Sequence, residues 1–264
     1  MASQRRRTAR DARRRQLGQN FLHDQRAIAR VLAIADPRPG DHVIELCAGT
    51  GALTRHLAAR HARVLAVELD PHWSARLRRS TADLDGVEVR TADALTMDLP
   101  HTPFRVVGNP PFNIGTRLLR RLLTADAPLQ DATVVLQIEA ARRLAGQPAT
   151  GRFSLSWAPW FEATVVDRID RRAFRPVPRV DAGIMRVHPR PVPWLSPARF
   201  AAWDGFVAAV FEADGRTAIE RLHAVLGPRR TRRLPATTRR ALAQPPSGVQ
   251  PVVWATVFRS DQRA

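Results

Sequence analysis

The feature that most constrains the fold is a short apolar run that ends in a glycine-rich turn. Residues 43–46 are Val-Ile-Glu-Leu, and Cys-Ala-Gly-Thr-Gly follows at residues 47–51. Leu53 and Leu57 then share one face of a predicted helix. A strand, a glycine turn and a helix N-terminus in this order can cradle a nucleotide, because glycines let the backbone approach the ligand and helix amides face its polar groups. Taken alone, this stretch is explained equally well by an ordinary turn.

Acidic residues follow the next two predicted strands. Residues 62–67 form an apolar strand that ends at Glu68. An acid about 20 positions past the glycines is where ribose hydroxyls are gripped in units of this kind. Residues 87–89 form a third strand, and Asp93 lies beyond its end, where its carboxylate could accept a hydrogen bond from an adenine amino group. Both acids have the chemistry that a bound nucleoside requires.

The fourth strand leads into a loop that suits an exocyclic amine. Residues 104–107 are Phe-Arg-Val-Val, and Gly-Asn-Pro-Pro-Phe follows at residues 108–112. The Asn109 side-chain oxygen and the Pro110 carbonyl can both accept hydrogen bonds from one NH2 group, and Phe112 can stack on a flat base. Two acceptors would hold the amine with its lone pair toward an electrophile. Asn-Pro-Pro is also an ordinary turn, because each proline fixes φ and biases the residue before it away from helix.

These four motifs support one another through their positions. Each follows the carboxyl end of a successive parallel strand, so all four lie at one edge of the sheet, where open α/β folds bind ligands. Apolar runs at residues 133–138, 163–166 and 183–187 would complete the sheet. The sequence therefore predicts an α/β domain with a nucleoside site at that edge.

The charge of the chain predicts a polyanionic partner. Its 264 residues carry a formal net charge of +18, more than solubility requires, and the Lys/Arg positions are all Arg. Arg binds phosphate with two parallel hydrogen bonds, so nucleic acid is the first candidate, although a GC-rich genome also favours Arg. A hydrophobic content of 44% allows a buried core, and no run is long enough to span a membrane. A single cysteine and an N-terminus without an apolar h-region predict a cytoplasmic location.

Changes in composition predict three parts. Residues 1–15 are rich in Arg and form an arm that we expect to be disordered until it meets phosphate, or else a solvated tail of biased composition. Residues 16–190 hold the α/β domain, with a lead-in helix across its edge. Residues 191–264 predict a small helical RNA-binding domain, with a helix capped at Ser196-Pro197, an Arg-rich segment, and short helices around 218–226 and 249–258.

In motif order, residues 16–187 resemble the rRNA adenine N6-dimethyltransferases. The matching residues are Gln19-Asn20-Phe21-Leu22, Glu45 with the Gly49 and Gly51 turn, Glu68, Asp93, Asn109-Pro110-Pro111-Phe112 and residues 174–180, Phe-Arg-Pro-Val-Pro-Arg-Val. The likeness is closest to the erythromycin-resistance (Erm) branch, which modifies one adenosine in 23S rRNA. This resemblance implies S-adenosyl-L-methionine as cofactor, a Rossmann-like catalytic domain, and resistance to macrolides, lincosamides and streptogramin B.

The resemblance also implies roles for the matching residues. The cofactor would be bordered by Gln19, Asn20, Leu22, Glu45, Cys47, Gly49, Gly51 and Asn109, with Glu68 on its ribose and Asp93 on its adenine. The catalytic loop would consist of Asn109, Pro110 and Phe112, with Phe174 as a second stacking face for the target base. Contacts to 23S rRNA are expected from Arg5, Arg6, Arg7, Arg13, Arg14 and Arg15. We expect a monomer without a metal, because a sulfonium methyl is already activated and transfer depends mostly on positioning.

Two residues depart from the family pattern, and two other functions stay open. Cys47 occupies the first glycine position, which preserves the backbone contacts of the turn if its φ is negative. Pro110 stands where the family usually has Ile or Leu. The small-subunit (16S) rRNA dimethyltransferases share nearly every motif, and a non-catalytic RNA-binding or transcription factor could retain the fold. Intact Asn109, Glu68 and Asp93 argue against the second alternative.

Overall fold

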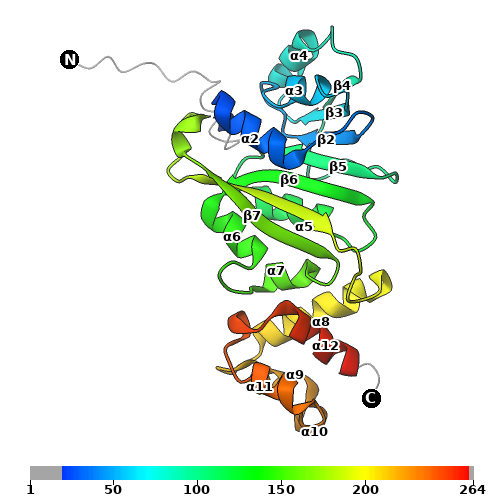
Figure 1. Cartoon of the computed structure of the whole chain (residues 1–264), viewed down its shortest axis with the longest axis vertical. Helices are drawn as coiled ribbons and strands as arrows, with labels where there is room; N and C mark the ends of the chain where they lie inside the picture. Colours follow the sequence, from blue (N-terminus) through cyan, green and yellow to red (C-terminus); the bar gives the residue numbers. More distant parts are fainter. Residues whose placement is uncertain (1–19, 262–264) are drawn as a thin grey trace, which may run out of the picture.

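The computed structural model describes residues 20–261 and contains a seven-stranded mixed sheet in the order β4-β3-β2-β5-β6-β9-β7 (Figure 1). The strands are β2 (His42–Leu46), β3 (Arg63–Glu68), β4 (Val87–Thr91), β5 (Phe104–Gly108), β6 (Leu129–Gln137), β7 (Phe161–Ile169) and β9 (Ala182–Pro189). The neighbouring strands β4, β3, β2, β5 and β6 are parallel to one another, and β9 runs antiparallel to both of its neighbours, β6 and β7. The predicted Rossmann-like α/β fold is confirmed. The strand order reverses between β2 and β5, the position where such sheets bind ligands.

Helices cover both faces of this sheet, because consecutive strand residues point to opposite sides. Val107 and Val135 share one apolar cluster with residues of α2 (Gln25–Ala35), α3 (Thr54–Ala58) and α4 (Pro71–Ser80). Val106 and Val134 share the other with residues of α5 (Gly115–Leu122), α6 (Ile138–Ala145) and α7 (Arg152–Trp157). The central strands are therefore buried on both faces.

The lead-in helix, predicted to lie across the edge of the α/β domain, is α2, and it covers part of one face of the sheet. The Asp24 carboxylate caps α2 by accepting a hydrogen bond from the Ala27 amide at 2.8 Å, and the helix ends at Asp36 with a left-handed φ of 41°. Ile28 and Val31 are fully buried in the cluster that includes Val135 of β6. This apolar stripe requires a face, because an edge offers only part of the area that the stripe buries.

Other boundaries also differ from the predicted ones. Strand β6 begins at Leu129, earlier than expected, and Ile138 already belongs to α6. Helices α6 and α7 are not evident from the sequence, because each is short and buries only two or three side chains. Their positions depend on packing against the sheet more than on a long amphipathic pattern.

A two-stranded sheet joins the start of the described chain to the loop before β9. Strand β1 (Phe21–Leu22) pairs antiparallel with β8 (Phe174–Arg175), and Leu22 lies opposite Phe174. Short pairs of this kind leave little trace in the hydrophobic pattern, so the sequence does not reveal this one. It holds the lead-in segment next to the carboxyl end of β5.

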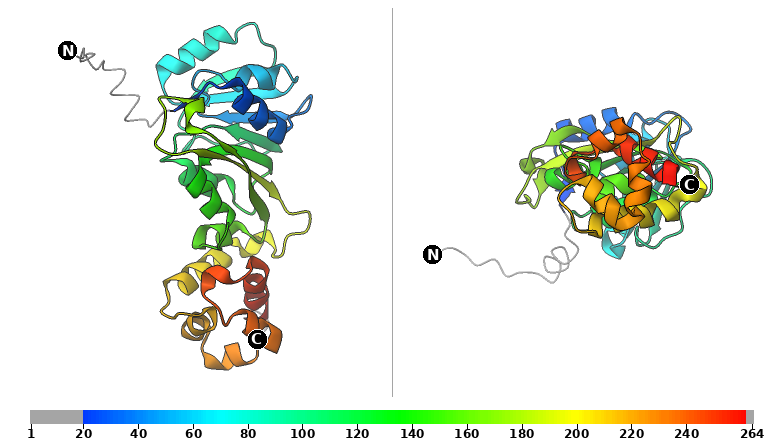
Figure 2. Two further views of the ribbon diagram at one scale, coloured as in Figure 1. Left: turned by 60° about the vertical axis from the view of Figure 1, so that its left-hand side comes forward. Right: turned by 90° about the horizontal axis from the view of Figure 1, so that it is seen from below.

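The helical part of the chain packs against the end of the sheet domain (Figures 1 and 2). Its helices are α8 (Phe200–Glu212), α9 (Ala218–Leu226), α10 (Pro228–Arg232), α11 (Ala236–Ala241) and α12 (Pro251–Asp261); the sequence predicts α8, α9 and α12 but not α10 and α11. Trp203 is fully buried and donates a hydrogen bond from Nε1 to the Leu155 carbonyl of α7 at 3.0 Å. The two parts thus share one apolar cluster. Within residues 20–261, no helix has the length and apolarity needed to cross a bilayer.

Candidate active site

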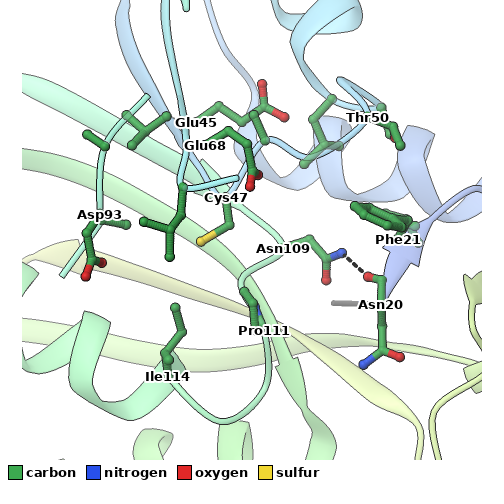
Figure 3. A pocket seen from close by; sticks show the side chains of 18 of the residues that line it. Asn20, Phe21, Glu45, Cys47, Thr50, Glu68, Asp93, Asn109, Pro111 and Ile114 are labelled. Carbon is green, nitrogen blue, oxygen red and sulfur yellow. Dashed lines mark hydrogen bonds between the residues drawn. The ribbon is translucent and has the colours of Figure 1, made fainter. Parts of the chain in front are cut away.

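A pocket opens at the carboxyl edge of β2, β3 and β5 (Figure 3). All four predicted strand-end motifs reach it. Its lining residues include Asn20, Leu22, Glu45, Cys47, Glu68, Asp93 and Asn109, together with Phe21, Thr50, Pro111 and Ile114. Within residues 20–261, the residues that line it include no Arg, Lys or His. This acidic pocket therefore stands out in a chain whose net charge is +18.

The glycine turn between β2 and α3 requires glycine at two positions. Gly49 has φ of 56°, and a Cβ on it would lie 2.7 Å from Cε1 of the Phe21 ring. Gly51 has φ of 80°, and a Cβ there would overlap Leu77. L-residues with side chains are strained at such φ values, so any side chain here would be opposed by both backbone and packing. The amides of Gly49 and Gly51 donate to the Glu68 carboxylate and the Ala48 carbonyl, and Ala48 and Thr50 of the turn line the pocket.

Glu68 is held at the end of β3 by backbone amides. Its two carboxylate oxygens accept hydrogen bonds from the amides of Gly49 at 2.8 Å and Asp70 at 2.9 Å. Burial raises the pKa of Glu68, and these two hydrogen bonds oppose that rise. Each oxygen retains a second lone pair, so the carboxylate is oriented and can still accept hydrogen bonds from a ligand.

Glu45 lies deeper, beneath the turn. It is 2% exposed, and its carboxyl accepts a hydrogen bond from the Thr54 hydroxyl at 2.5 Å. Burial, with a smaller contribution from the nearby Glu68 charge, raises the pKa of Glu45 to about 8. Without a cation nearby, this carboxyl holds its proton at neutral pH.

Asp93 and apolar side chains form the opposite wall. One Asp93 carboxylate oxygen accepts a hydrogen bond from the Leu95 amide at 2.8 Å, which leaves the other oxygen for a ligand. Leu69, Leu95 and Ile114 also line the pocket, and Leu69 is 48% exposed. The sequence motifs do not include these three residues. The signal available for Leu69 is its place directly after the acid that ends β3.

Asn109 is fixed by the segment that precedes β1. Its Nδ2 donates a hydrogen bond to the Asn20 carbonyl at 2.9 Å, and Figure 3 shows its side-chain oxygen pointing into the pocket. That oxygen, Oδ1, is buried and accepts no hydrogen bond from the described residues. A buried acceptor without a partner is costly, so the site favours a ligand that brings an N–H donor to this point.

The structure places Phe174 differently from the sequence-based expectation. Phe174 is completely buried and meets Phe112 edge-on, with ring centroids 6.2 Å apart. It therefore has no free face for a base. Phe112 is only half-buried and can still offer a face, with Phe174 supporting it from behind. Pro110 is buried, and its neighbour Pro111 lines the pocket instead.

Cys47 also differs from the expected geometry, because its φ is +60° and not negative. A left-handed conformation is unfavourable for a residue with a Cβ. Figure 3 shows the sulfur directed into the pocket. Burial, and then the carboxylates of Glu68 and Asp93, raise the pKa of this thiol far above its usual range, so it stays neutral. Gln19 and the arm residues Arg5 to Arg15 lie outside the described residues.

Comparison with known proteins identifies the family. The family model for ribosomal RNA adenine dimethylases matches residues 10–244. The chain belongs to this family. It is an rRNA adenine N6-methyltransferase, and its cofactor is S-adenosylmethionine.

Three known proteins illustrate the extent of the likeness. The crystal structure of the 23S rRNA methyltransferase ErmE superposes with a TM-score of 0.81 at 34% identity and covers 92% of this chain and 100% of that one. Mycinamicin-resistance protein MyrB of Micromonospora griseorubida is 36% identical over 93% of this chain and 78% of its own length. Ribosomal RNA small subunit methyltransferase A of Marinobacter nauticus is 35% identical over 67% of this chain and 66% of its own length.

The pocket of this methyltransferase fits its cofactor. The carboxyl groups of Glu68 and Asp93 suit a ligand with a positive charge, hydroxyls and an amino group. The apolar walls at Leu69 and Ile114 suit a flat ring. The partnerless Asn109 oxygen lies where an amine can donate to it. When bound, S-adenosylmethionine supplies a methyl group that its sulfonium already activates.

Proposed function

We propose that this enzyme methylates N6 of one adenosine in 23S rRNA and confers resistance to macrolides, lincosamides and streptogramin B. The observation that supports this choice is the extent of the likeness. Sequence similarity to MyrB covers 93% of the chain, so it includes the helical part. Similarity to the small-subunit enzyme is of equal identity but covers only 67%.

In this proposal each residue of the pocket contacts a different part of the cofactor. Glu68 accepts hydrogen bonds from the ribose hydroxyls of the cofactor, and Asp93 accepts one from its adenine amino group. Leu69 and Ile114 cover the adenine ring, and Asn20 and Leu22 close the other side. Glu45 and the glycine turn lie beneath the methionine part. These roles follow from the hydrogen-bonding capacity and position of each side chain along the pocket wall.

Asn109 and Phe112 would act on the target base. Phe112 stacks on a base that has been flipped out of the RNA, and Asn109 Oδ1 accepts a hydrogen bond from its amino group. The Asn109 amide is already oriented by the Asn20 carbonyl, so little reorganisation is needed when the base arrives. The amino group keeps its lone pair toward the methyl group, and its proton leaves to solvent after transfer.

A direct comparison of the two ribosomal RNAs tests the proposal. Purified enzyme with tritiated S-adenosylmethionine is given protein-free 23S rRNA and 16S rRNA in parallel, and the modified base is mapped by primer extension. We expect one stop in 23S rRNA, with erythromycin resistance in a sensitive host that expresses the protein. Stops in 16S rRNA alone, without resistance, would assign the enzyme to the small-subunit branch.

A further inference from the structure

An aromatic side chain of α4 packs against one wall of the pocket from outside. Phe21 lines the pocket, and its ring centroid lies 4.9 Å from that of Trp73, with the two ring planes inclined at 59°. Tilted aromatic pairs at this separation attract one another beyond the area that they bury. Trp73 itself is half-buried and lies outside the set of described residues that line the pocket. Its influence on a ligand would therefore pass through Phe21.

Phe21 and α4 enclose the glycine turn from two sides. A Cβ on Gly49 would collide with the Phe21 ring, and a Cβ on Gly51 would collide with Leu77 of α4. Trp73 and Leu77 are four residues apart in α4, so they lie on the same face of that helix. Leu77 is fully buried, which fixes this face against the turn. Trp73 extends the same face from the turn to the Phe21 ring.

The first turn of α4 is also tied to the acid at the end of β3. The Asp70 carboxylate caps α4 by accepting a hydrogen bond from the His72 amide at 2.9 Å. The Asp70 amide in turn donates to Glu68 at 2.9 Å. Trp73 follows in the same helical turn. Its position is therefore fixed relative to the carboxylate that is assigned to the cofactor ribose.

Phe21 belongs to the short segment that orients the catalytic loop. The preceding carbonyl, that of Asn20, accepts the hydrogen bond from Asn109 Nδ2 at 2.9 Å. Figure 3 shows the Phe21 ring beside Thr50 of the glycine turn and Asn20 facing Asn109. Strand β1 has only two residues, and two-stranded pairs contribute little stability by themselves. Side-chain contacts such as that of Phe21 with Trp73 therefore help to decide how firmly residues 20–22 are held.

We propose that Trp73 is a positioning residue for the cofactor. It holds Phe21, and with it residues 20–22, against the glycine turn, so this wall of the pocket is in place before S-adenosylmethionine arrives. A wall that is in place only part of the time lowers the apparent affinity by that fraction. The inference rests on the proposed placement of the cofactor in this pocket, and it does not depend on which ribosomal RNA is methylated.

The test measures cofactor affinity in two variants of Trp73. Trp73→Leu removes the ring, whereas Trp73→Phe keeps an aromatic partner for Phe21. Calorimetric titration of the full chain gives the Kd for S-adenosylmethionine and for S-adenosylhomocysteine, which share the nucleoside. The matched control is Trp194→Leu. Trp194 is also half-buried and has an arginine over its ring, as Trp73 does, but it lies between β9 and α8, toward the opposite end of the molecule from α4 (Figure 1).

Trp73→Leu should raise the Kd for both ligands about five-fold, because the loss of one aromatic pair corresponds to a change of this size. Trp73→Phe should restore most of the affinity, and Trp194→Leu should match wild type. In a Phe21→Leu background, Trp73→Leu should have no further effect, because the ring on which Trp73 acts is gone. A loss that depended only on general stability would persist in that background.

An unchanged Kd in Trp73→Leu, or an undiminished effect in the Phe21→Leu background, would overturn the proposal. Urea midpoints confirm folding, and Trp73→Gln replaces Trp73→Leu if the latter does not fold. Glu68→Gln tests the pocket separately. An unchanged Kd in Glu68→Gln would refute the proposed cofactor placement, whereas a weakened Glu68→Gln beside an unaffected Trp73→Leu would refute only the role of Trp73.

Discussion

At the scale of single residues, Asn109 links the segment before β1 to the pocket. Its amide nitrogen is occupied by the Asn20 carbonyl, and its oxygen has no partner within the described residues. Because the nitrogen is held by Asn20, the side-chain oxygen is the atom that is left for the substrate. In the proposed role, this side chain contributes mainly to the transition state, because its oxygen gains its best partner only when the amine is aligned.

Asn109→Ala should therefore lower kcat by at least about 100-fold, which corresponds to roughly 3 kcal/mol of transition-state stabilisation. The Kd for S-adenosylmethionine should stay within a few fold of wild type. Single-turnover methyl transfer and calorimetric titration measure the two quantities separately. More than a tenth of wild-type activity would show that the base amine is held elsewhere.

Glu45 should make stability depend on pH. Burial raises its pKa from an ordinary value of 4.5 to about 8. Between these values the folded state binds a proton that the unfolded state has lost, so the free energy of unfolding should fall as pH rises from about 5 to 8. Glu45→Gln should flatten this decline and be more stable than wild type at pH 8. Denaturant titrations of both cofactor-free proteins at pH 5 and pH 8 test this. Parallel declines in the two proteins would contradict it.

Cys47 carries backbone strain that two substitutions can measure. Cys47→Gly and Cys47→Ala both remove the thiol, but only Ala keeps a Cβ at a φ near +60°. The glycine variant should be more stable than the alanine variant by about 1 kcal/mol. Urea midpoints of the two variants give this difference. Equal midpoints would mean that the turn relaxes away from the left-handed conformation.

At the scale of elements, the β1–β8 pair and the loop after β5 form one unit. Leu22 lies opposite Phe174, and Phe174 packs edge-on against Phe112 of the loop. The pair thereby positions the Asn20 carbonyl and supports the Phe112 ring, which we propose stacks on the target base. A short two-stranded sheet thus forms part of the pocket wall.

Two conservative substitutions distinguish the packing role of Phe174 from the proposed base-stacking role of Phe112. Phe174→Leu should destabilise the protein by about 1 to 2 kcal/mol, because it alters a fully buried ring, while the folded enzyme keeps most of its kcat. Phe112→Leu should do the reverse, with a lower kcat and nearly unchanged stability. Methyl-transfer rates below the melting range, with urea midpoints, measure both. An equal loss of kcat in the two variants would return Phe174 to the base-stacking role.

At the scale of the whole molecule, the sheet and the C-terminal helices share one core. Trp157 and Trp160 of the sheet part are buried together with Trp203 and Trp254 of the helical part. Separating the two parts would expose a large apolar surface on each, and neither part alone could bury that surface again.

The full chain should therefore unfold in a single transition. Urea curves followed by tryptophan fluorescence, by circular dichroism and by loss of cofactor binding should superimpose. A fragment ending at residue 190 should aggregate, because it leaves the cluster around Trp157 without its cover. Two resolved transitions, or a soluble fragment that binds the cofactor, would show that the parts fold independently.

Much of the site can be predicted from the sequence, because its chemistry is local. The glycine turn, Glu68, Asp93 and Asn109 each follow a strand by a few residues, and the rule that parallel strands end at one edge brings them together. Strand alternation likewise indicates which residues enter the core. These signals depend on residues close to one another in the chain, so they can be recognised in the sequence alone.

The tertiary structure decided the features that depend on distant contacts. The burial of Phe174, the orientation of Asn109 by Asn20 and the positive φ of Cys47 each arise where segments far apart in the chain meet. Ile114 is recognisable as a pocket wall only after the fold brings it to the same pocket as Asp93. Hydrophobic period and residue type do not encode which segments pair, because that choice depends on the total area and hydrogen bonding of the assembled molecule.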